Sequence, residues 1–408
     1  MNLVITPKTL KGEVLVPPSK SAGHRIVIAS ALAGGGKVYN ITLSEDIKAT
    51  LNCMKALGAV FSLEGNTVTF FEFTNVTDET ITLDCEESGS TLRFLIPLAL
   101  ALYPNKALVF KGKGRLLERP LDVYFDIFKK HDIYYHKDSQ SLTVKGELKA
   151  GEYQFSGKIS SQFVTGFLYA LSLLNKESKI VITDTLESKG YVDMTIDVLK
   201  DFGVSVKNCD YKEFIISSQK YSPCDITVEG DFSQGAFFYT ANFIGSDISV
   251  LGLKENSKQG DKKVCEILES FKNNEDIILD VSDIPDLVPT LAIASAYREG
   301  RKTQFINGAR LKMKESDRIK TTCEMLDALG AEVIEGDDSI TVFGQKKLSP
   351  KRSVDCHNDH RIAMATAVAC VGADKDISVI GAECVKKSYP NFWEDYKRLG
   401  GEIKEVGR

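Results

Sequence analysis

The sequence repeats one pattern six times, and this repeat constrains the fold more than any other feature of the chain. Each copy opens with polar or charged residues and then stays apolar for the length of a helix. A period of this length predicts a supersecondary unit that recurs along the chain. The copies begin at Ser19, Ser88, Ser160, Ser233, Ile284 and Asn358, with gaps of 69, 72, 73, 51 and 74 residues.

The first copy predicts what one unit contains. Ser19 or Ser21 can cap a helix whose body, residues 26–33, is apolar on nearly every side. A helix that is apolar all round is typically buried. The unit is completed by a strand over 38–42, an amphipathic helix over 46–57 and a hairpin formed by strands 60–63 and 67–73.

The two ends of the chain each lack part of a unit. The strand expected over 3–5 has no helix before it, and the last copy stops at 401–403, short of a final strand. We therefore expect the two ends to complete one unit together. The prediction is an α/β (α+β) fold of six βαβαββ units, with buried helices and outer sheets, packed as two groups of three. The expected domains are 19–228 and 1–18 plus 229–408, with a crossing point at 228–231.

Bulk composition predicts a soluble protein of a reducing compartment. The hydrophobic fraction of 43% is sufficient for a large core, and a net charge of −5 gives no sign of nucleic-acid binding. The nine cysteines include no CxxC pair, which argues against a zinc site and a disulfide framework. The first residues lack the apolar core of a signal peptide, and the longest apolar run, 94–103, is too short to span a membrane. We expect a cytoplasmic protein.

Basic residues stand at the starts of several predicted buried helices, namely Lys20, Arg25, Arg93 and Arg361. A helix start presents unpaired N–H groups and a partial positive charge, so it attracts anions. A cation at this position opposes the helix dipole, and it therefore favours anion binding over helix stability. Each residue taken alone is equally well explained as a solvated charge. Their matching places in the repeat favour an anion-binding site.

Other charged segments are less specific. The basic stretches 111–119, 312–318 and 385–387 resemble ordinary solvated faces when each is taken alone, and no GxxxxGK[ST] phosphate loop occurs. Asp286, at a helix start, and Glu315, among the three cations Lys312, Lys314 and Arg318, are candidates for acid–base chemistry. For Glu315, a structural ion-pair network is the competing interpretation.

Ten segments, in this order, resemble the enolpyruvyl transferases, and within that family the branch that acts on shikimate 3-phosphate. The resemblance covers essentially the whole chain. The segments are 18–25 (PSKSAGHR), 88–93 (SGSTLR), 115–120 (RLLERP), 160–163 (SSQF), 188–193 (SKGYVD), 228–231 (VEGD), 284–286 (IPD), 314–318 (KESDR), 358–364 (NDHRIAM) and 387–390 (KSYP).

The resemblance implies a fold and a reaction. The family fold is a two-domain inside-out α/β barrel with three βαβαββ units in each domain and the active site in the cleft between the domains. Its enzymes of this branch transfer the enolpyruvyl group of phosphoenolpyruvate to the 5-hydroxyl of shikimate 3-phosphate and release phosphate. Neither a metal nor an organic cofactor is implied. The expectation is a monomeric enzyme with two small-molecule substrates.

The resemblance also implies roles for individual residues. Catalysis would involve Lys20, Asp286, Glu315 and His360, with Asp286 accepting the hydroxyl proton and Glu315 delivering a proton to the methylene carbon. Shikimate 3-phosphate would be bound by Lys20, Ser21, Arg25, Ser160, Ser161, Gln162, Ser188, Tyr191, Asp286 and Lys314. Phosphoenolpyruvate would be bound by Lys20, Gly89, Arg93, Arg115, Gln162, Arg318, Arg361 and Lys387.

Two departures and two rival functions qualify the resemblance. Glu86 and Glu87 stand where the family often has Gly-Asn, and Asn307 is offset from an asparagine expected before Lys314. The enolpyruvyl transferase of UDP-N-acetylglucosamine shares the fold, but it typically has Lys-Asn at 20–21 and a cysteine in the segment 111–120, which has none here. A non-catalytic anion-binding protein is the rival from another class.

Overall fold

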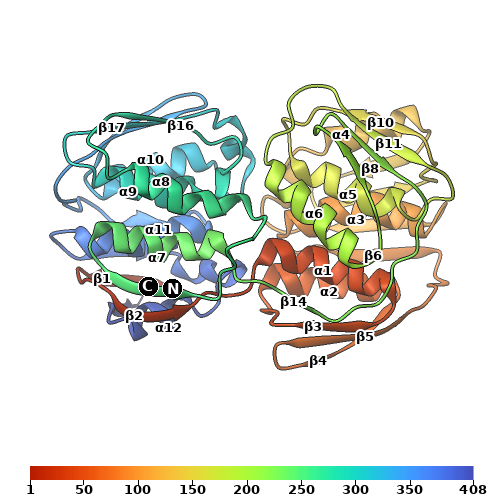
Figure 1. Cartoon of the computed structure of the whole chain (residues 1–408), viewed down its shortest axis with the longest axis horizontal. Helices are drawn as coiled ribbons and strands as arrows, with labels where there is room; N and C mark the ends of the chain where they lie inside the picture. The colour runs from red at the N-terminus through yellow and green to blue at the C-terminus, as the bar shows by residue number, and fades with distance from the viewer. Residues whose placement is uncertain (408) are drawn as a thin grey trace. The chain divides into compact units, whose positions relative to one another are not determined.

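A computed structural model describes residues 1–407. The chain forms two compact units (Figure 1). One unit, Pro18–Glu229, is here called the inserted unit. The other combines Met1–Pro17 with Gly230–Arg408 and is called the terminal unit. Within the described residues, no helix is both long enough and apolar enough to cross a membrane.

Three buried helices form the core of the inserted unit. Each begins at a serine whose side-chain oxygen accepts a backbone N–H of the first turn, and each is buried along most of its length because its residues are apolar or small on all sides. An amphipathic helix follows later in each repeat. The buried helices are α1 (Lys20–Ala33), α3 (Gly89–Leu102) and α5 (Ser161–Leu171); the amphipathic ones are α2 (Glu45–Ala56), α4 (Asp122–Lys130) and α6 (Lys189–Asp201).

Three four-stranded sheets belong to the inserted unit, and each has the same topology. A strand that precedes a buried helix pairs in parallel with a strand that follows such a helix, and an antiparallel hairpin completes the sheet. The strand orders are β14 (Ile226–Thr227), β3 (Gly36–Tyr39), β5 (Thr67–Phe73), β4 (Ala59–Glu64); β6 (Thr80–Asp84), β7 (Ala107–Lys111), β9 (Ser141–Lys145), β8 (Tyr134–Lys137); and β10 (Glu152–Phe155), β11 (Ser178–Ile182), β13 (Glu213–Ile216), β12 (Lys207–Cys209).

The terminal unit repeats this arrangement in part. Its buried helices are α7 (Phe232–Ile244), α9 (Val288–Ala296) and α11 (His360–Ala369), accompanied by α8 (Val264–Ser270), α10 (Arg318–Ala328) and α12 (Phe392–Arg398). Its sheets have the orders β16 (Ile277–Asp280), β17 (Lys302–Ile306), β19 (Ile340–Phe343), β18 (Glu332–Glu335); β20 (Val354–Asp355), β21 (Ile377–Ile380), β1 (Asn2–Thr6), β22 (Glu402–Val406); and β15 (Asp247–Leu251) with β2 (Lys11–Leu15).

The structure confirms the predicted α/β fold with repeated units, buried helices and outer sheets, and it corrects one copy. The fourth copy is not a full βαβαββ unit, because β15 pairs only with β2 and no hairpin follows. The missing hairpin accounts for the short gap of 51 residues before the fifth copy. The sheets are also separate from one another in hydrogen bonding, so they do not close into a continuous barrel.

The two chain ends complete one sheet, as the sequence predicts. Strand β1 pairs antiparallel with both β21 and β22, and it takes the place that β19 has in the preceding sheet. Figure 1 marks the two termini next to each other. The strands that open the first and fourth copies are exchanged between sheets, since β2 precedes α1 but pairs with β15, while β14 precedes α7 but pairs with β3.

Candidate functional site

The start of α1 carries the first predicted basic residue. The Ser19 side chain accepts a hydrogen bond from the N–H of Ala22 at 3.3 Å and caps the helix. Lys20 is the first helical residue, and its Nζ lies 2.7 Å from Asp46 Oδ2 in the first turn of α2. The lysine and the aspartate are mostly buried, with 17% and 13% of their side chains exposed. Lys20 is thus held at the helix start and not extended into solvent.

Arg25 lies one turn further along α1 and connects three helices. Its Nη1 donates to the carbonyl of Ser21 at 2.6 Å, its Nε to Thr195 Oγ1 at 2.8 Å and its Nη2 to the carbonyl of Tyr191 at 3.0 Å. The guanidinium also lies 5.1 Å from the ring centroid of Phe94. Burial lowers the pKa of Arg25 to about 10, so the side chain remains charged at neutral pH.

The starts of α3 and α5 are joined by side chains. Arg93 Nη1 donates to Gln162 Oε1 at 2.7 Å, and Gln162 Nε2 donates to Ser90 Oγ at 3.0 Å. Ser160 caps α5, because its hydroxyl accepts the N–H of Gln162 at 3.2 Å. Ser161 is the first residue of this helix and is buried. The structure therefore brings the predicted residues of the second and third copies into one cluster.

The loop 111–119 contributes an arginine that sequence reasoning missed. A Cβ atom added to Gly89 would lie 2.7 Å from Arg119 Nη1 and 3.6 Å from Arg93 Nη1, so two guanidinium groups lie over this glycine. The predicted residue, Arg115, instead has 49% of its side chain exposed and lies 3.5 Å from the carboxylate of Glu118. Arg119 was detectable only as a second arginine in the same basic loop.

The two glutamates that depart from the family pattern engage the same loop. Glu86 Oε2 lies 2.6 Å from Lys113 Nζ, and the carboxylate carbon of Glu87 lies 3.1 Å from the position of a Cβ on Gly114.

Ser188, at the start of α6, is fully buried and has a left-handed backbone with φ of 57°. A strained backbone at a buried serine is typical of functional sites.

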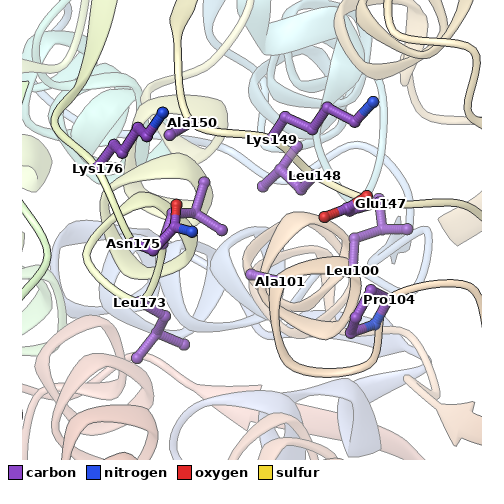
Figure 2. Close-up of a pocket in the computed structure, with 11 residues that line it drawn as sticks. Leu100, Ala101, Pro104, Glu147, Leu148, Lys149, Ala150, Leu173, Asn175 and Lys176 are labelled. Carbon is purple, nitrogen blue, oxygen red and sulfur yellow. The ribbon is translucent and has the colours of Figure 1, made fainter.

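A pocket of about 420 Å³ lies at the C-terminal ends of α3 and α5, whereas the predicted residues stand at the N-terminal ends of these helices (Figure 2). Leucines 100, 148 and 173 and the polar side chains of Lys149 and Asn175 line it. None of the predicted site residues lines this pocket. It is therefore separate from the cluster at the helix starts.

In the terminal unit, Asp286 is the centre of a second cluster. It lies in the short helix η3 (Pro285–Leu287), directly before α9. Its Oδ1 lies 2.6 Å from Arg318 Nη1 and 3.2 Å from Lys314 Nζ, and its Oδ2 lies 3.2 Å from Arg361 Nη2. Three cations from two segments, 314–318 and 358–364, thus meet one carboxylate, which has 16% of its side chain exposed.

Arg318 is itself shared by three carboxylates. Its Nη2 lies 2.6 Å from Glu315 Oε2, and its Nε lies 2.8 Å from Asp359 Oδ2. Burial alone would raise the pKa of Asp359, but the charge and hydrogen bond of Arg318 hold it below its ordinary value. Asp359 also caps α11 by accepting the N–H of Arg361 at 3.0 Å. Asp359 is not among the predicted site residues, although it stands in the motif 358–364 as an N-cap residue.

The remaining predicted residues lie near the start of α11. His360, its first residue, is buried. Lys387, at the end of η6 (Ala382–Lys387), is also buried, and its Nζ donates to the carbonyl of Asn358 at 2.9 Å. Burial lowers the pKa of Lys314. Each unit therefore holds one cluster in which arginines, lysines and helix starts can bind anions, and the second cluster adds two carboxylates that can transfer protons.

Comparisons with known proteins agree with this chemistry. The sequence profile of a family described as EPSP synthase (3-phosphoshikimate 1-carboxyvinyltransferase) matches residues 4–396. A 3-phosphoshikimate 1-carboxyvinyltransferase of Clostridium kluyveri is 45% identical over 98% of this chain and 98% of its own length. A protein of the same name from Clostridioides difficile is 44% identical over 99% of this chain and 98% of its own length.

Solved structures show the same fold. A solved structure of EPSP synthase from Acinetobacter baumannii has a TM-score of 0.81 and 24% identity, and the match covers 99% of this chain and all of that one. The enolpyruvyl transferase NikO from Streptomyces tendae has a TM-score of 0.75 and 15% identity, covering 99% of this chain and 98% of its own.

Proposed function

This chain belongs to the EPSP synthase family, and we propose that its two charged clusters bind the substrates and perform the proton transfers of that enzyme. The enzyme transfers the enolpyruvyl group of phosphoenolpyruvate to the 5-hydroxyl of shikimate 3-phosphate, a reaction of aromatic amino acid biosynthesis. Protonation of the methylene carbon makes C2 electrophilic, and the hydroxyl oxygen adds to C2. The tetrahedral intermediate then loses phosphate and a methyl proton, which restores the double bond.

The cluster of the inserted unit is proposed to bind the anionic groups. Each substrate carries a carboxylate and a phosphate, and planar guanidinium groups match both in a bidentate manner. For shikimate 3-phosphate, the support is the convergence of α1, α5 and α6 on Arg25. We assign this substrate to Lys20, Ser21, Arg25, Ser160, Ser161, Gln162, Ser188 and Tyr191. Gly89, Arg93 and Arg115 are assigned to phosphoenolpyruvate, and the structure adds Arg119 to this set.

The cluster of the terminal unit is proposed to carry the acid–base steps. The observation that carries this proposal is the contact of Asp286 with three cations, which keep the carboxylate ionised and able to accept the 5-hydroxyl proton. Glu315 also contacts Arg318. It would take up a proton when the substrate anions neutralise the surrounding cations, and would then protonate the methylene carbon, with Lys20 assisting. Phosphoenolpyruvate would be held by Arg318, Arg361 and Lys387, while Lys314 would contact shikimate 3-phosphate and His360 would support the site.

Both clusters are proposed to serve one reaction. The proposal involves no metal and no organic cofactor, because the acid, the base and the cations are all side chains. We also infer that the enzyme acts as a monomer in the cytoplasm. The described cysteines are all free thiols, which supports a reducing compartment.

Replacing Glu315 by glutamine tests the proposal. The amide keeps the shape but cannot donate the proton, so turnover should fall by about 10²- to 10⁴-fold while shikimate 3-phosphate still binds. Phosphate release is measured with both substrates, and binding by calorimetry. Glu332→Gln, at an exposed position of β18, is the matched control.

Two outcomes would contradict the assignment. Near-normal turnover of Glu315→Gln would remove Glu315 as the general acid. Phosphate release by the wild-type enzyme with UDP-N-acetylglucosamine, but none with shikimate 3-phosphate, would instead identify the rival enolpyruvyl transferase and overturn the function itself.

A further inference from the structure

Four buried polar side chains connect the starts of three helices in the inserted unit, and the reaction described above uses none of them. They are His24 of α1, Thr50 of α2, and Ser88 and Thr91 at the start of α3, and none has more than 1% of its surface exposed. Thr50 Oγ1 lies 2.6 Å from His24 Nδ1 and 2.7 Å from Thr91 Oγ1. Thr91 Oγ1 lies 2.7 Å from Ser88 Oγ. The Thr50 hydroxyl is thus the link between α1 and α3.

The hydrogen bonds of this chain run in one direction. A hydroxyl has one proton to donate and can accept two hydrogen bonds. Thr91 donates its proton to Ser88, so it must accept the proton of Thr50, which lies closer to it than to the Asp46 carbonyl at 3.3 Å. The Thr50 oxygen must then accept an N–H from His24 Nδ1. Burial lowers the pKa of His24 to about 3, so its ring is neutral and carries this single N–H.

Each end of the chain adjoins residues that are proposed to bind phosphoenolpyruvate. Ser88 caps α3, whose first residue is Gly89, and two guanidinium groups lie over this glycine. Thr50 lies on α2 one turn after Asp46, whose carboxylate holds Lys20 of α1 at 2.7 Å. Lys20 and Gly89 belong to different helices, so their separation depends on how α1 and α3 are held together through α2.

We propose that Thr50 is a positioning residue that fixes the start of α3 against α1, and with it the distance between Gly89 and Lys20. This inference rests on the proposed function, which assigns both residues to phosphoenolpyruvate. Thr50 acts through its two neighbours in the chain. Without its hydroxyl, the N–H of His24 loses its acceptor and Thr91 loses its donor, and buried polar groups without partners are costly. These groups should then turn to other partners and move the start of α3.

The chain should affect one substrate more than the other. Arg25, proposed to bind shikimate 3-phosphate, is held by hydroxyl and carbonyl groups of α1 and α6 that do not belong to the chain. Gly89 and Arg93, both on α3, are assigned to phosphoenolpyruvate alone. Loss of the Thr50 hydroxyl should therefore weaken the use of phosphoenolpyruvate and leave the binding of shikimate 3-phosphate largely intact.

Thr50→Val tests this role, because valine has nearly the same shape and no hydroxyl. We expect kcat/KM for phosphoenolpyruvate to fall by about 10- to 100-fold, while calorimetry still detects the binding of shikimate 3-phosphate to the free enzyme. Thr50→Ser keeps the hydroxyl and should restore most of kcat/KM. The matched control is Thr366→Val, which removes a buried hydroxyl that donates to the carbonyl of Ile362 in the same helix at 2.7 Å. It should leave kcat/KM near the wild-type value.

The proton on His24 gives a test that needs no active variant. Heteronuclear NMR of the five imidazole rings of the wild type should show His24 protonated on Nδ1, the signal being the one that His24→Asn removes. A ring protonated on Nε2 would reverse the chain and overturn the inference. Thr91→Val breaks the next link and should lower kcat/KM in the same way if Thr50→Val does not fold.

The outcomes separate this inference from the proposed function. An active wild type with unchanged kcat/KM for Thr50→Val, or equal losses in Thr50→Val and Thr50→Ser, contradicts only the role of Thr50. If the wild type releases no phosphate from the two substrates, it is the proposed function that fails.

Discussion

Replacing Arg318 by methionine should destabilise the terminal unit strongly. The guanidinium is 1% exposed and contacts Asp286, Glu315 and the fully buried Asp359 at 2.6, 2.6 and 2.8 Å. Methionine has a similar length but leaves these carboxylates without their shared cation. Removing one partner of a buried ion pair costs about 3–5 kcal/mol, because the remaining charge stays buried. We expect the free energy of unfolding of the variant to be lower than that of the wild type by an amount in that range at pH 7.

The loss should depend on pH in a defined direction. In the wild type, the pKa of Asp359 in the folded state lies below its ordinary value, although burial alone would raise it, because Arg318 and His360 favour the ionised form. Its stabilising contribution is thus present above the unfolded pKa and is lost as pH falls through the folded pKa. Without Arg318, burial raises the pKa of Asp359 in the folded state, and protonation then removes the cost of its unpaired buried charge. The difference in the free energy of unfolding between wild type and variant should therefore shrink from pH 7 towards pH 4.

Urea unfolding followed by circular dichroism at pH 7 and pH 4.5 measures this difference. The control is Arg352→Met, which removes an arginine 2.5 Å from Asp327 with more than half of each side chain exposed. Exposed pairs contribute only about 0–1 kcal/mol, so the control should stay near wild type. Equal effects of the two substitutions, or an Arg318→Met loss that does not change with pH, would refute the reasoning.

Two further predictions concern the inserted unit. Gly166→Ala places a Cβ 2.6 Å from the backbone oxygen of Arg93, where α3 and α5 touch. Overpacking costs about 1–3 kcal/mol and the better helix propensity of alanine gains about 1 kcal/mol, so we expect the substitution to lower the free energy of unfolding. Gly23→Ala, whose Cβ meets only a movable isoleucine side chain at 3.1 Å, should be neutral or stabilising; urea midpoints that rank the two in reverse would contradict this. His24 is buried beside Thr50, and burial lowers its pKa to about 3. The unfolded state therefore binds the proton first, and the free energy of unfolding of the wild type should fall by up to about 1.4 kcal/mol per pH unit between about pH 6 and pH 4. His24→Asn cannot titrate and should lack this loss; parallel pH–stability curves for the two proteins would disprove it.

Local signals in the sequence were sufficient for the helices and for the repeat. Of the two candidate caps of the first helix, Ser19 and Ser21, the structure selects Ser19, and serines cap α3 and α5 in the same way. Such caps are local, because a capping hydroxyl bonds to N–H groups only two or three residues away. The strand expected over 38–42 ends earlier, at Tyr39, because Asn40 adopts a positive φ of 56°. Such a boundary depends on the turn that follows and not on hydrophobic alternation.

The arrangement of the site was only partly predictable. The basic and acidic residues at helix starts were identified individually, and the structure brings Asp286 together with Lys314, Arg318 and Arg361. Which arginine of the loop 111–119 reaches Gly89 was not predictable, since Arg115 and Arg119 differ only in how the turn at 116–118 directs them.

Local patterns along the chain are enough to predict the repeated unit, the buried helices and the incomplete unit that the two chain ends complete. These features follow from periodicity and capping, which are encoded by residues near one another in the chain. Contacts between distant parts of the chain determine that β2 and β14 exchange sheets, that the fourth repeat has no hairpin, and that Arg119 and Asp359 adjoin the predicted site residues. Strand pairing and the electrostatics of buried groups depend on contacts between residues far apart in sequence, and no local pattern specifies those contacts.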